Sequence, residues 1–119
     1  MRGRNICPHI HIENLFLELN TAIPCGLLIN ELVSNSLKYA FSDNIKGELT
    51  IHLHPVNETF ELIISDNGVG LPEDLDFRNT ESLGFTLVMS WVNQLQGEIE
   101  LDRTSGTCFR ITFKELHYK

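Results

Sequence analysis

The sequence lacks an apolar run of the roughly 20 residues that a helix needs to cross a bilayer. No apolar block follows its first residues, so it shows no secretory leader. It is also poor in basic residues, with 9 Lys and Arg against 16 Asp and Glu and a net charge of −7. This balance argues against a general nucleic-acid binder, which needs cations to neutralise phosphates. We therefore expect neither direct membrane contact nor nucleic-acid binding.

Cysteine is scarce as well. Cys7, Cys25 and Cys108 are odd in number, widely spaced and without a CxxC pair, which argues against a disulfide scaffold and favours reduced thiols in the cytosol. The 119 residues, 42% of them hydrophobic, suffice for one domain with one core. We expect residues 1–9 to be a disordered N-terminal remnant and residues 10–119 to form that domain.

Alternating apolar residues predict strands, and apolar residues at helical spacing predict helices. In the first half of the chain we expect a strand over Ile10–Leu19, a helix over Cys25–Phe41 with Pro24 in its first turn, and a hairpin of Leu49–Leu53 and Phe60–Ile64. A long irregular segment over Asp66–Ser82 follows. The second half continues with a helix over Leu83–Gln96 ended by Gly97, and with strands at Ile99–Leu101 and Phe109–Phe113. This order predicts an α+β fold, a two-layer α/β sandwich whose mixed, mostly antiparallel sheet is covered on one face by helices.

The first helix gathers unlike polar groups on one side. Glu31, Asn35, Lys38 and Tyr39 return to nearly the same face, because the helix has 3.6 residues per turn. Asn35 offers a Mg²⁺ ligand and Glu31 can bind a metal-held water or accept a proton, while Lys38 can meet phosphate and Tyr39 a flat ring. An amphipathic helix with a solvated polar face would have the same pattern. The opposite face would pack on the core through Ile29, Leu32, Val33, Leu37 and Ala40.

The segment Asp66-Asn-Gly-Val-Gly70 follows an apolar strand, so Asp66 is expected at the end of the sheet, near the interior. A carboxylate there can accept a hydrogen bond from an exocyclic amine such as adenine N6 and reject a carbonyl in the same place. Gly68 and Gly70 allow a sharp turn and close approach to a ligand. A simple hairpin turn remains open, because Asn-Gly is a common turn signal.

Two further segments could contact a nucleotide. Ser82 and Gly84 open the second long helix, whose free N–H groups favour anions and where glycine leaves space for a phosphate. An ordinary Ser82 N-cap explains the same residues. Thr107 could point a hydroxyl into a base pocket, although its segment is a turn by default.

The histidines come in pairs at strand spacing. His9 and His11, like His52 and His54, would each place two imidazoles on one strand face. A metal site is conceivable, but solvated strand histidines are the favoured interpretation because no third ligand cluster lies nearby in sequence.

In this order the segments resemble the ATP-binding catalytic domain of sensor histidine kinases, which has the Bergerat fold of gyrase, the large heat-shock chaperone ATPases and the mismatch-repair ATPases. Ala22–Phe41 looks like the N box, Asp66–Gly70 like the G1 box, Ser82–Val88 like the G2 box and Gly106–Phe113 like the closing strand. The likeness is to the subfamily often found behind PAS sensor domains. It covers the chain from about residue 10 to residue 114.

The resemblance implies that the domain binds ATP and Mg²⁺ and transfers the γ-phosphate to a histidine on a separate dimerisation domain, with a response regulator as indirect partner. By position it implies that Asn35 and Glu31 are the metal and catalytic residues and that Lys38, Ser82 and Gly84 lie near the phosphates. Around the base, it implies that Asp66 accepts from adenine N6 and that Tyr39 and Thr107 lie near the adenine. Gly68 and Gly70 would form the pocket floor and the hinge of the lid.

The sequence also departs from the family pattern. There is no clear F box, for which Phe77 is a loose candidate, the segment between Gly70 and Gly84 is short, and Phe85 stands where leucine is usual. No helical pair with a phosphoacceptor histidine is present, so the chain resembles an excised, monomeric catalytic domain in the cytoplasm, with a parent that can be membrane-anchored.

Other functions stay open at this stage. They are a nucleotide-dependent binding module without transfer activity, a serine kinase of the anti-sigma type with the same fold, and a purely structural interaction domain.

Overall fold

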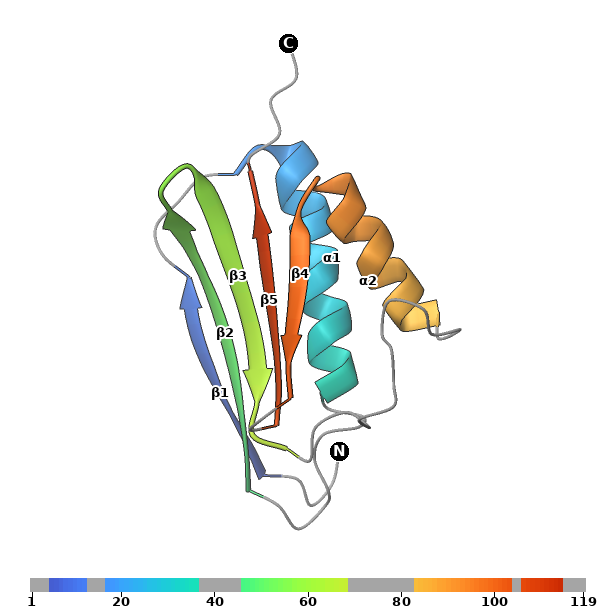
Figure 1. The fold of residues 1–119 in the computed structure, drawn as a ribbon. Helices are drawn as coiled ribbons and strands as arrows, with labels where there is room; N and C mark the ends of the chain where they lie inside the picture. Colours follow the sequence, from blue (N-terminus) through green and yellow to red (C-terminus); the bar gives the residue numbers. More distant parts are fainter. Residues whose placement is uncertain (1–4, 13–16, 37–45, 69–82, 104–105, 115–119) are drawn as a thin grey trace.

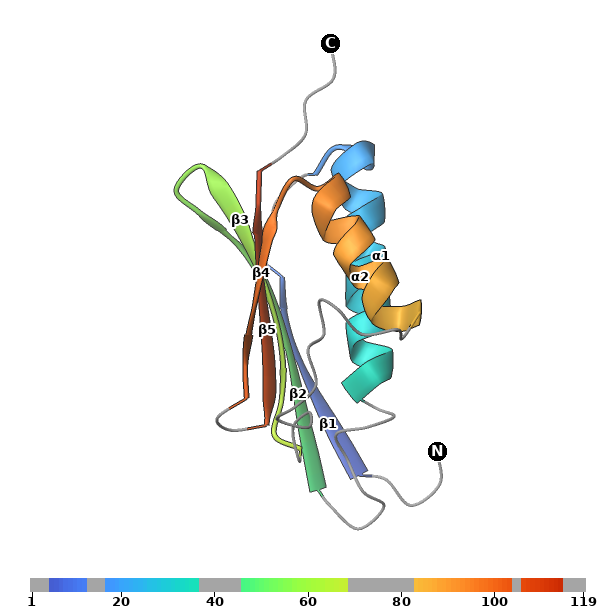
Figure 2. The ribbon, with the colours of Figure 1, turned by 45° about the vertical axis from the view of Figure 1, so that its right-hand side comes forward.

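The computed structural model describes residues 5–12, 17–36, 46–68, 83–103 and 106–114. Within them, one sheet is covered on one face by two helices that lie side by side (Figures 1 and 2). Neither of the two helices in these residues has the length and the apolar content that a membrane span requires. The elements are β1 (Asn5–Ile12), α1 (Leu19–Asn35), β2 (Lys46–Val56), β3 (Thr59–Asp66), α2 (Leu83–Gln94), β4 (Glu98–Asp102) and β5 (Thr107–Phe113).

The five strands lie in the order β1-β2-β3-β5-β4. β1 runs parallel to β2, and the other neighbours are antiparallel. The predicted two-layer sandwich with a mixed, mostly antiparallel sheet is therefore confirmed. The predicted hairpin is present too: Val56 pairs with Thr59 across a tight turn, in which Asn57 adopts a positive φ of 57°. Asparagine tolerates this conformation better than most residues.

The core lies between the sheet and the helices. Leu28 and Leu32, one turn apart on α1, are 0% and 1% exposed, and α2 buries Val88 and Leu95 in the same way. From the sheet, alternate residues of β2, β3 and β5 point to this side, as their period of two requires. These sheet residues are Leu49, Ile51, Leu53, Leu62, Ile64, Phe109, Ile111 and Phe113.

The N-terminal elements differ from the prediction. The first strand is Asn5–Ile12 rather than Ile10–Leu19, so residues 5–9, where we expected disorder, belong to β1. Helix α1 begins at Leu19, not Cys25, because the carbonyl of Glu18 accepts the first helical N–H groups without a side-chain cap. Pro24 is thus inside the helix, where it is buried in the core, and its missing N–H removes one backbone bond.

Helix α2 also ends differently. We expected the helix to continue to Gln96 and Gly97 to end it, but it ends at Gln94, and Gln96 takes the left-handed conformation with a φ of 55°. Gly97 follows and approaches β5 closely, since a Cβ there would lie 2.5 Å from the carbonyl oxygen of Thr112. Glycine is therefore required by the tight passage from α2 into β4.

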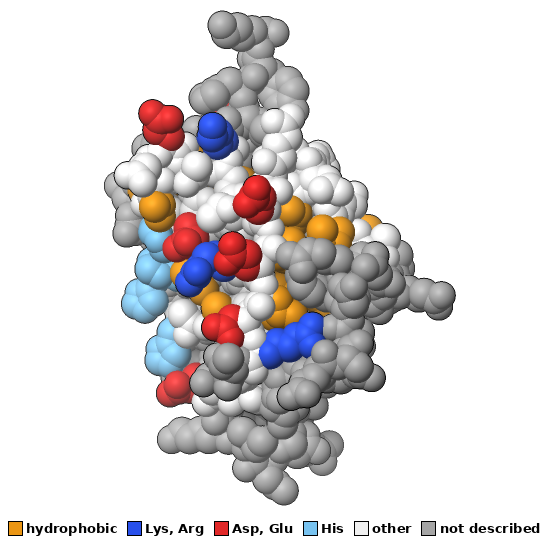
Figure 3. Space-filling model, in the orientation of Figure 1, with side chains coloured by type: hydrophobic (Ala, Val, Ile, Leu, Met, Phe, Trp, Pro, Cys, Tyr) orange, Lys and Arg blue, Asp and Glu red, His pale blue; other side chains and the backbone are white. Residues whose placement is uncertain are grey.

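We call the face of the sheet without helices the open face. Polar residues of β2 alternate with its core residues and point to this side, and Figure 3 shows histidine side chains gathered along one edge of the molecule. Further across the sheet, Glu61 lies between His54 and Arg110. Its Oε1 is 3.1 Å from His54 Nε2, and its Oε2 is 3.5 Å from Arg110 Nε. By register, β4 adds Glu98 and Glu100, beside Thr112 and Arg110.

Candidate nucleotide site

Asp66 is the last residue of β3 and is only 6% exposed. A buried carboxylate needs donors to replace its lost hydration, and here the polypeptide supplies them. Ser36 Oγ donates to Oδ2 at 2.8 Å, while the backbone N–H groups of Gly68 and Thr107 donate to Oδ1 at 3.0 and 3.3 Å. The predicted position of Asp66, at the end of the sheet and near the interior, is confirmed.

The hydrogen bond between Ser36 and Asp66 joins segments that are 30 residues apart in sequence. Ser36 directly follows Asn35 at the C-terminal end of α1, where its own N–H reaches the carbonyls of Leu32 and Val33. The nucleotide pocket that the family resemblance implies requires the end of this helix to lie beside the end of β3. The structure brings these two segments into direct contact.

Asn35 carries a buried side-chain nitrogen, Nδ2, that has no hydrogen-bond partner among the described residues. Leaving a buried polar group unpaired costs about 1–3 kcal/mol, so such a group calls for a partner. Rotation about χ2 exchanges the amide oxygen and nitrogen, so this position can present an acceptor to a cation or a donor to a phosphate. Both properties fit a magnesium-bound nucleotide.

The turn after Asp66 is fixed from two sides. On the β2 side, the Asn67 side chain accepts a hydrogen bond from the Glu48 N–H at 2.7 Å, and the Asn67 N–H donates to the Glu48 carbonyl. On the β5 side, Gly106 has a φ of +85°, and a Cβ there would lie 2.2 Å from the Asp66 carbonyl oxygen. The site therefore has a rigid floor built from three strands.

Three of the predicted residues meet at this carboxylate: Asp66 itself, Gly68 and the buried Thr107. Asn35 directly precedes Ser36, which donates to Asp66. Thr107 contacts Asp66 by its backbone N–H, and the role expected for its hydroxyl stays a prediction.

The other predicted residues are placed less directly. Glu31 is half-buried on α1, one turn before Asn35, and Gly84 lies in the first turn of α2. Lys38, Tyr39, Gly70 and Ser82 lie outside the described residues, as do Phe77 and the short lid segment.

Sequence reasoning missed Ser36, Asn67 and Gly106. A signal for Ser36 existed, because it continues the buried ridge of Leu28 and Leu32 at four-residue spacing. A hydroxyl in line with core leucines should have suggested a buried polar partner.

The histidines were a possible metal site. The rings of His11 and His52 meet across β1 and β2 with centroids 6.0 Å apart, and those of His52 and His54 are 4.2 Å apart. However, the described residues contain no group of three or more His, Cys, Asp or Glu side chains that could hold a metal ion. The favoured interpretation, solvated strand histidines, fits the exposed His9 and His11, whereas His54 is half-buried and pairs with Glu61.

Comparison with known proteins agrees with the fold. The profile of the family described as histidine kinase-, DNA gyrase B- and HSP90-like ATPases matches residues 20–117. The chain belongs to this family. Within it, the chain corresponds to the ATP-binding catalytic domain of sensor histidine kinases.

Individual relatives support this placement. The chain is 30% identical over 105 residues to "Blue-light-activated histidine kinase 2" of Erythrobacter litoralis, covering 87% of this chain and 30% of the relative. The solved histidine kinase domain of the blue-light activated histidine kinase EL346 from E. litoralis superposes with a TM-score of 0.87 at 28% identity, covering 92% of this chain and 52% of that one. A shorter match, 34% identical over 55 residues, is to the serine-protein kinase RsbW of Listeria innocua, over 46% of this chain and 34% of the relative.

The chain thus spans about a third of the length of the curated relatives described here.

Proposed function

We propose that this domain binds Mg·ATP with the adenine amino group against Asp66. The observation that carries the proposal is the fixed position of the Asp66 carboxylate: three donors from α1, the G1 turn and β5 hold it in place. A carboxylate has about four acceptor positions, so one is left for a further donor. The adenine N6 amine would fill this position, whereas guanine would place its carbonyl oxygen against the carboxylate oxygen of Asp66.

The metal and the phosphates would lie toward the end of α1. Asn35 and Glu31 would hold Mg²⁺, which neutralises the charge that develops on the phosphates. Lys38, Ser82 and Gly84 would contact the phosphate groups, and Tyr39 would flank the base. The unpaired buried Nδ2 of Asn35 supports this arrangement.

We further propose that the domain presents the γ-phosphate to a histidine on a separate dimerisation domain, from which a response regulator would receive it. Phosphoryl transfer needs little covalent help from the protein, since positioning and charge neutralisation supply most of the acceleration. By itself the domain would be monomeric and cytoplasmic, and it would bind nucleotide but turn over slowly.

Binding is tested by titrating the chain with ATP by calorimetry, with Mg²⁺ and with EDTA. We expect Mg·ATP to bind, GTP to bind at least about tenfold more weakly, and Asn35→Ala to lose most of the dependence on Mg²⁺. Asn93→Ala, which changes an exposed asparagine on α2, serves as the control. An Asn35→Ala variant with unchanged metal dependence would remove Asn35 from the site.

The acceptor is tested with labelled ATP and a dimerisation domain that carries its histidine. Label on this partner that is lost in acid supports transfer to histidine, because phosphohistidine is acid-labile. Acid-stable label would support a serine kinase, a candidate favoured by the shorter match to RsbW. Tight binding of Mg·ATP without any label would support a nucleotide-dependent binding module.

A further inference from the structure

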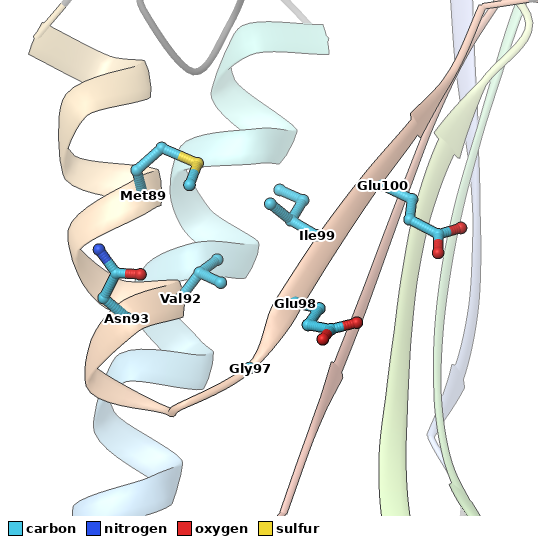
Figure 4. A pocket seen from close by; sticks show the side chains of 7 residues that line it. All are labelled: Met89, Val92, Asn93, Gly97, Glu98, Ile99 and Glu100. Atoms are coloured by element: carbon cyan, nitrogen blue, oxygen red, sulfur yellow. The ribbon is translucent and has the colours of Figure 1, made fainter.

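Three of the exposed large apolar side chains lie on α1. Figure 4 shows a pocket between α2 and β4, but its apolar members Val92 and Ile99 are only 2% and 5% exposed, so this pocket offers little surface to a partner. On α1, by contrast, Leu19, Ile23 and Leu27 are 70%, 53% and 40% exposed. A partner that covers α1 would therefore bury far more apolar surface.

These three residues follow one another at four-residue spacing and form a single ridge, because side chains four apart on a helix are neighbours. We call Leu19, Ile23 and Leu27 the apolar row. Residues 19–30 contain no charged side chain. The outer face of a surface helix is normally polar or charged, so an uncharged outer face with an exposed apolar row indicates a contact surface.

Gly26 lets another helix approach this surface. It is exposed, and a Cβ added to it would meet no atom within 4 Å, so the fold itself does not require a glycine at this position. In the interior of a helix, glycine is less favourable than alanine. Without a side chain here, the axis of a helix packed on α1 can come closer than the usual distance of about 8–10 Å.

The apolar row leads to the candidate nucleotide site. At the same four-residue spacing it continues into Glu31 and Asn35, and Ser36 beside Asn35 donates to Asp66. Exposure falls along the row, and Glu31 and Asn35 are half-buried, so the ridge passes from the outer surface of α1 toward the site. Leu27 and Asn35 are two turns apart, about 12 Å along the helix axis. A helix packed on the row would reach the site with its next turns.

The chemistry and the size of the row select the partner. A charged segment would lose hydration against this surface and find no opposite charge on it, whereas the apolar face of an amphipathic helix would pack on it. Three side chains are few for a stable complex with a free protein, which needs about 20–30 residues a side. They suffice for a transient contact, and a phosphoryl acceptor must leave after the transfer.

We propose that the apolar row is the docking surface for the helix that carries the acceptor histidine. This proposal rests on the proposed transfer of the γ-phosphate. An apolar ridge of the acceptor helix packs against Leu19, Ile23 and Leu27 and passes closely over Gly26. The histidine lies one to two turns further along, at the level of Asn35. The row thus positions the acceptor without contacting the nucleotide.

The test is fluorescence anisotropy of a labelled dimerisation domain that carries its histidine, titrated with the full 119-residue chain. We expect saturable binding. The double variant Ile23→Ser/Leu27→Ser is expected to weaken it about tenfold or more, because two apolar contacts are lost. Gly26→Glu, which removes no apolar side chain but places a charge on the uncharged face, is expected to weaken it by a similar factor.

Two matched controls are expected to bind like the parent. Val56→Ser removes an exposed apolar side chain from the end of β2, and Asn93→Glu adds a carboxylate at an exposed position of α2. Circular dichroism verifies that all variants are folded. No binding of the labelled domain by the parent, or unchanged binding by Ile23→Ser/Leu27→Ser and Gly26→Glu, would each overturn the proposal. Self-association of the chain that both variants abolish would assign the row to a second copy instead.

Titration with Mg·ATP and a transfer assay separate this proposal from the proposed function. Both row variants are expected to keep the parental affinity for Mg·ATP, while their KM for the acceptor domain rises about tenfold and kcat changes little. A parent and row variants that transfer label with the same KM would refute the docking surface and uphold the proposed function. A parent that binds no Mg·ATP would refute the nucleotide site, whereas docking is measured by anisotropy without nucleotide.

Discussion

Asp66 is a carboxylate whose surroundings would tolerate an amide. Its Oδ1 accepts from two backbone N–H groups, and its Oδ2 accepts from the Ser36 hydroxyl. A serine hydroxyl can donate or accept, so an asparagine could keep its oxygen toward the N–H groups and donate its own N–H to Ser36. We therefore expect the charge of Asp66 to matter more for the proposed ligand than for the fold.

We expect Asp66→Asn to weaken ATP binding about 10- to 100-fold, because a hydrogen bond to a charged group contributes about 1.5–3 kcal/mol. The urea midpoint should change little. Calorimetry and urea titration provide the two measurements, with Asp102→Asn as an exposed control. If Asp66→Asn binds ATP as tightly as the parent, Asp66 does not read the base.

Cys25 adds a pH dependence to stability. Burial raises the pKa of its thiol to about 11, against 9.0 for the ordinary group, because the thiolate would lose its hydration. The folded state therefore holds this proton more tightly than the unfolded state. The resulting stabilisation is fully present below pH 9 and is lost as the pH rises toward 11.

This loss is measurable by difference. Between pH 8 and pH 11 the parent should lose up to about 2–3 kcal/mol of unfolding free energy more than Cys25→Ala, which lacks the thiol. Urea titrations at several pH values measure it. Parallel pH profiles for the two proteins would show that Cys25 does not ionise on unfolding.

At the scale of elements, the turn before β5 supports the end of β3. Gly106 combines a positive φ with close contact to the Asp66 carbonyl, so a side chain there would be strained twice. Gly26 is the natural comparison, because a Cβ added to it on α1 would meet no atom within 4 Å.

We therefore expect opposite results from the same substitution. Gly106→Ala should destabilise the domain by about 1–2 kcal/mol or more and also weaken ATP binding by shifting Asp66. Gly26→Ala should stabilise it by up to about 1 kcal/mol, since alanine is the better helix former. Urea unfolding measures both changes. An unchanged free energy of unfolding for Gly106→Ala would mean that the turn can shift to accommodate a side chain at little cost.

The elements also show how far the sequence could be interpreted. Strands β2, β3 and β5 and helix α2 follow clear periods, because each has one buried face. The start of α1 was missed since Glu18 caps it by its carbonyl alone and Pro24 suggested a first turn. β1 was misplaced because its Ile10 and Ile12 are 59% and 54% exposed, so burial does not impose a clean pattern there.

At the scale of the whole molecule, the site depends on non-local pairing. Asp66 receives its donors from Ser36, 30 residues before it, and from Thr107, 41 residues after it. Local periodicity predicts most of the elements but not that β5 lies between β3 and β4. The residue types of the site were predictable, and the contacts of Ser36 and Gly106 required the assembled sheet.

Because the site joins α1, β3 and β5, a bound nucleotide should stabilise the whole domain. At a Mg·ATP concentration 100 times its dissociation constant, the expected gain is about 2.7 kcal/mol of unfolding free energy. Thermal unfolding with and without Mg·ATP measures it, and Asp66→Asn at the same ligand concentration should gain much less. A melting temperature that does not respond to Mg·ATP would contradict binding to the folded state.

The parallel pairing of β1 has a consequence for the acceptor. Asn5 pairs with Lys46, a few residues along β2 from Leu49, which pairs with Asp66; Phe113, at the end of β5, pairs with Phe60 at the opposite end of the sheet. Any helical segment joined upstream of β1 would thus be tethered at the end of the sheet that holds the candidate nucleotide site. A short linker raises the local concentration of a phosphoacceptor without any specific contact. An acceptor fused after β5 would need a linker that spans the length of the sheet.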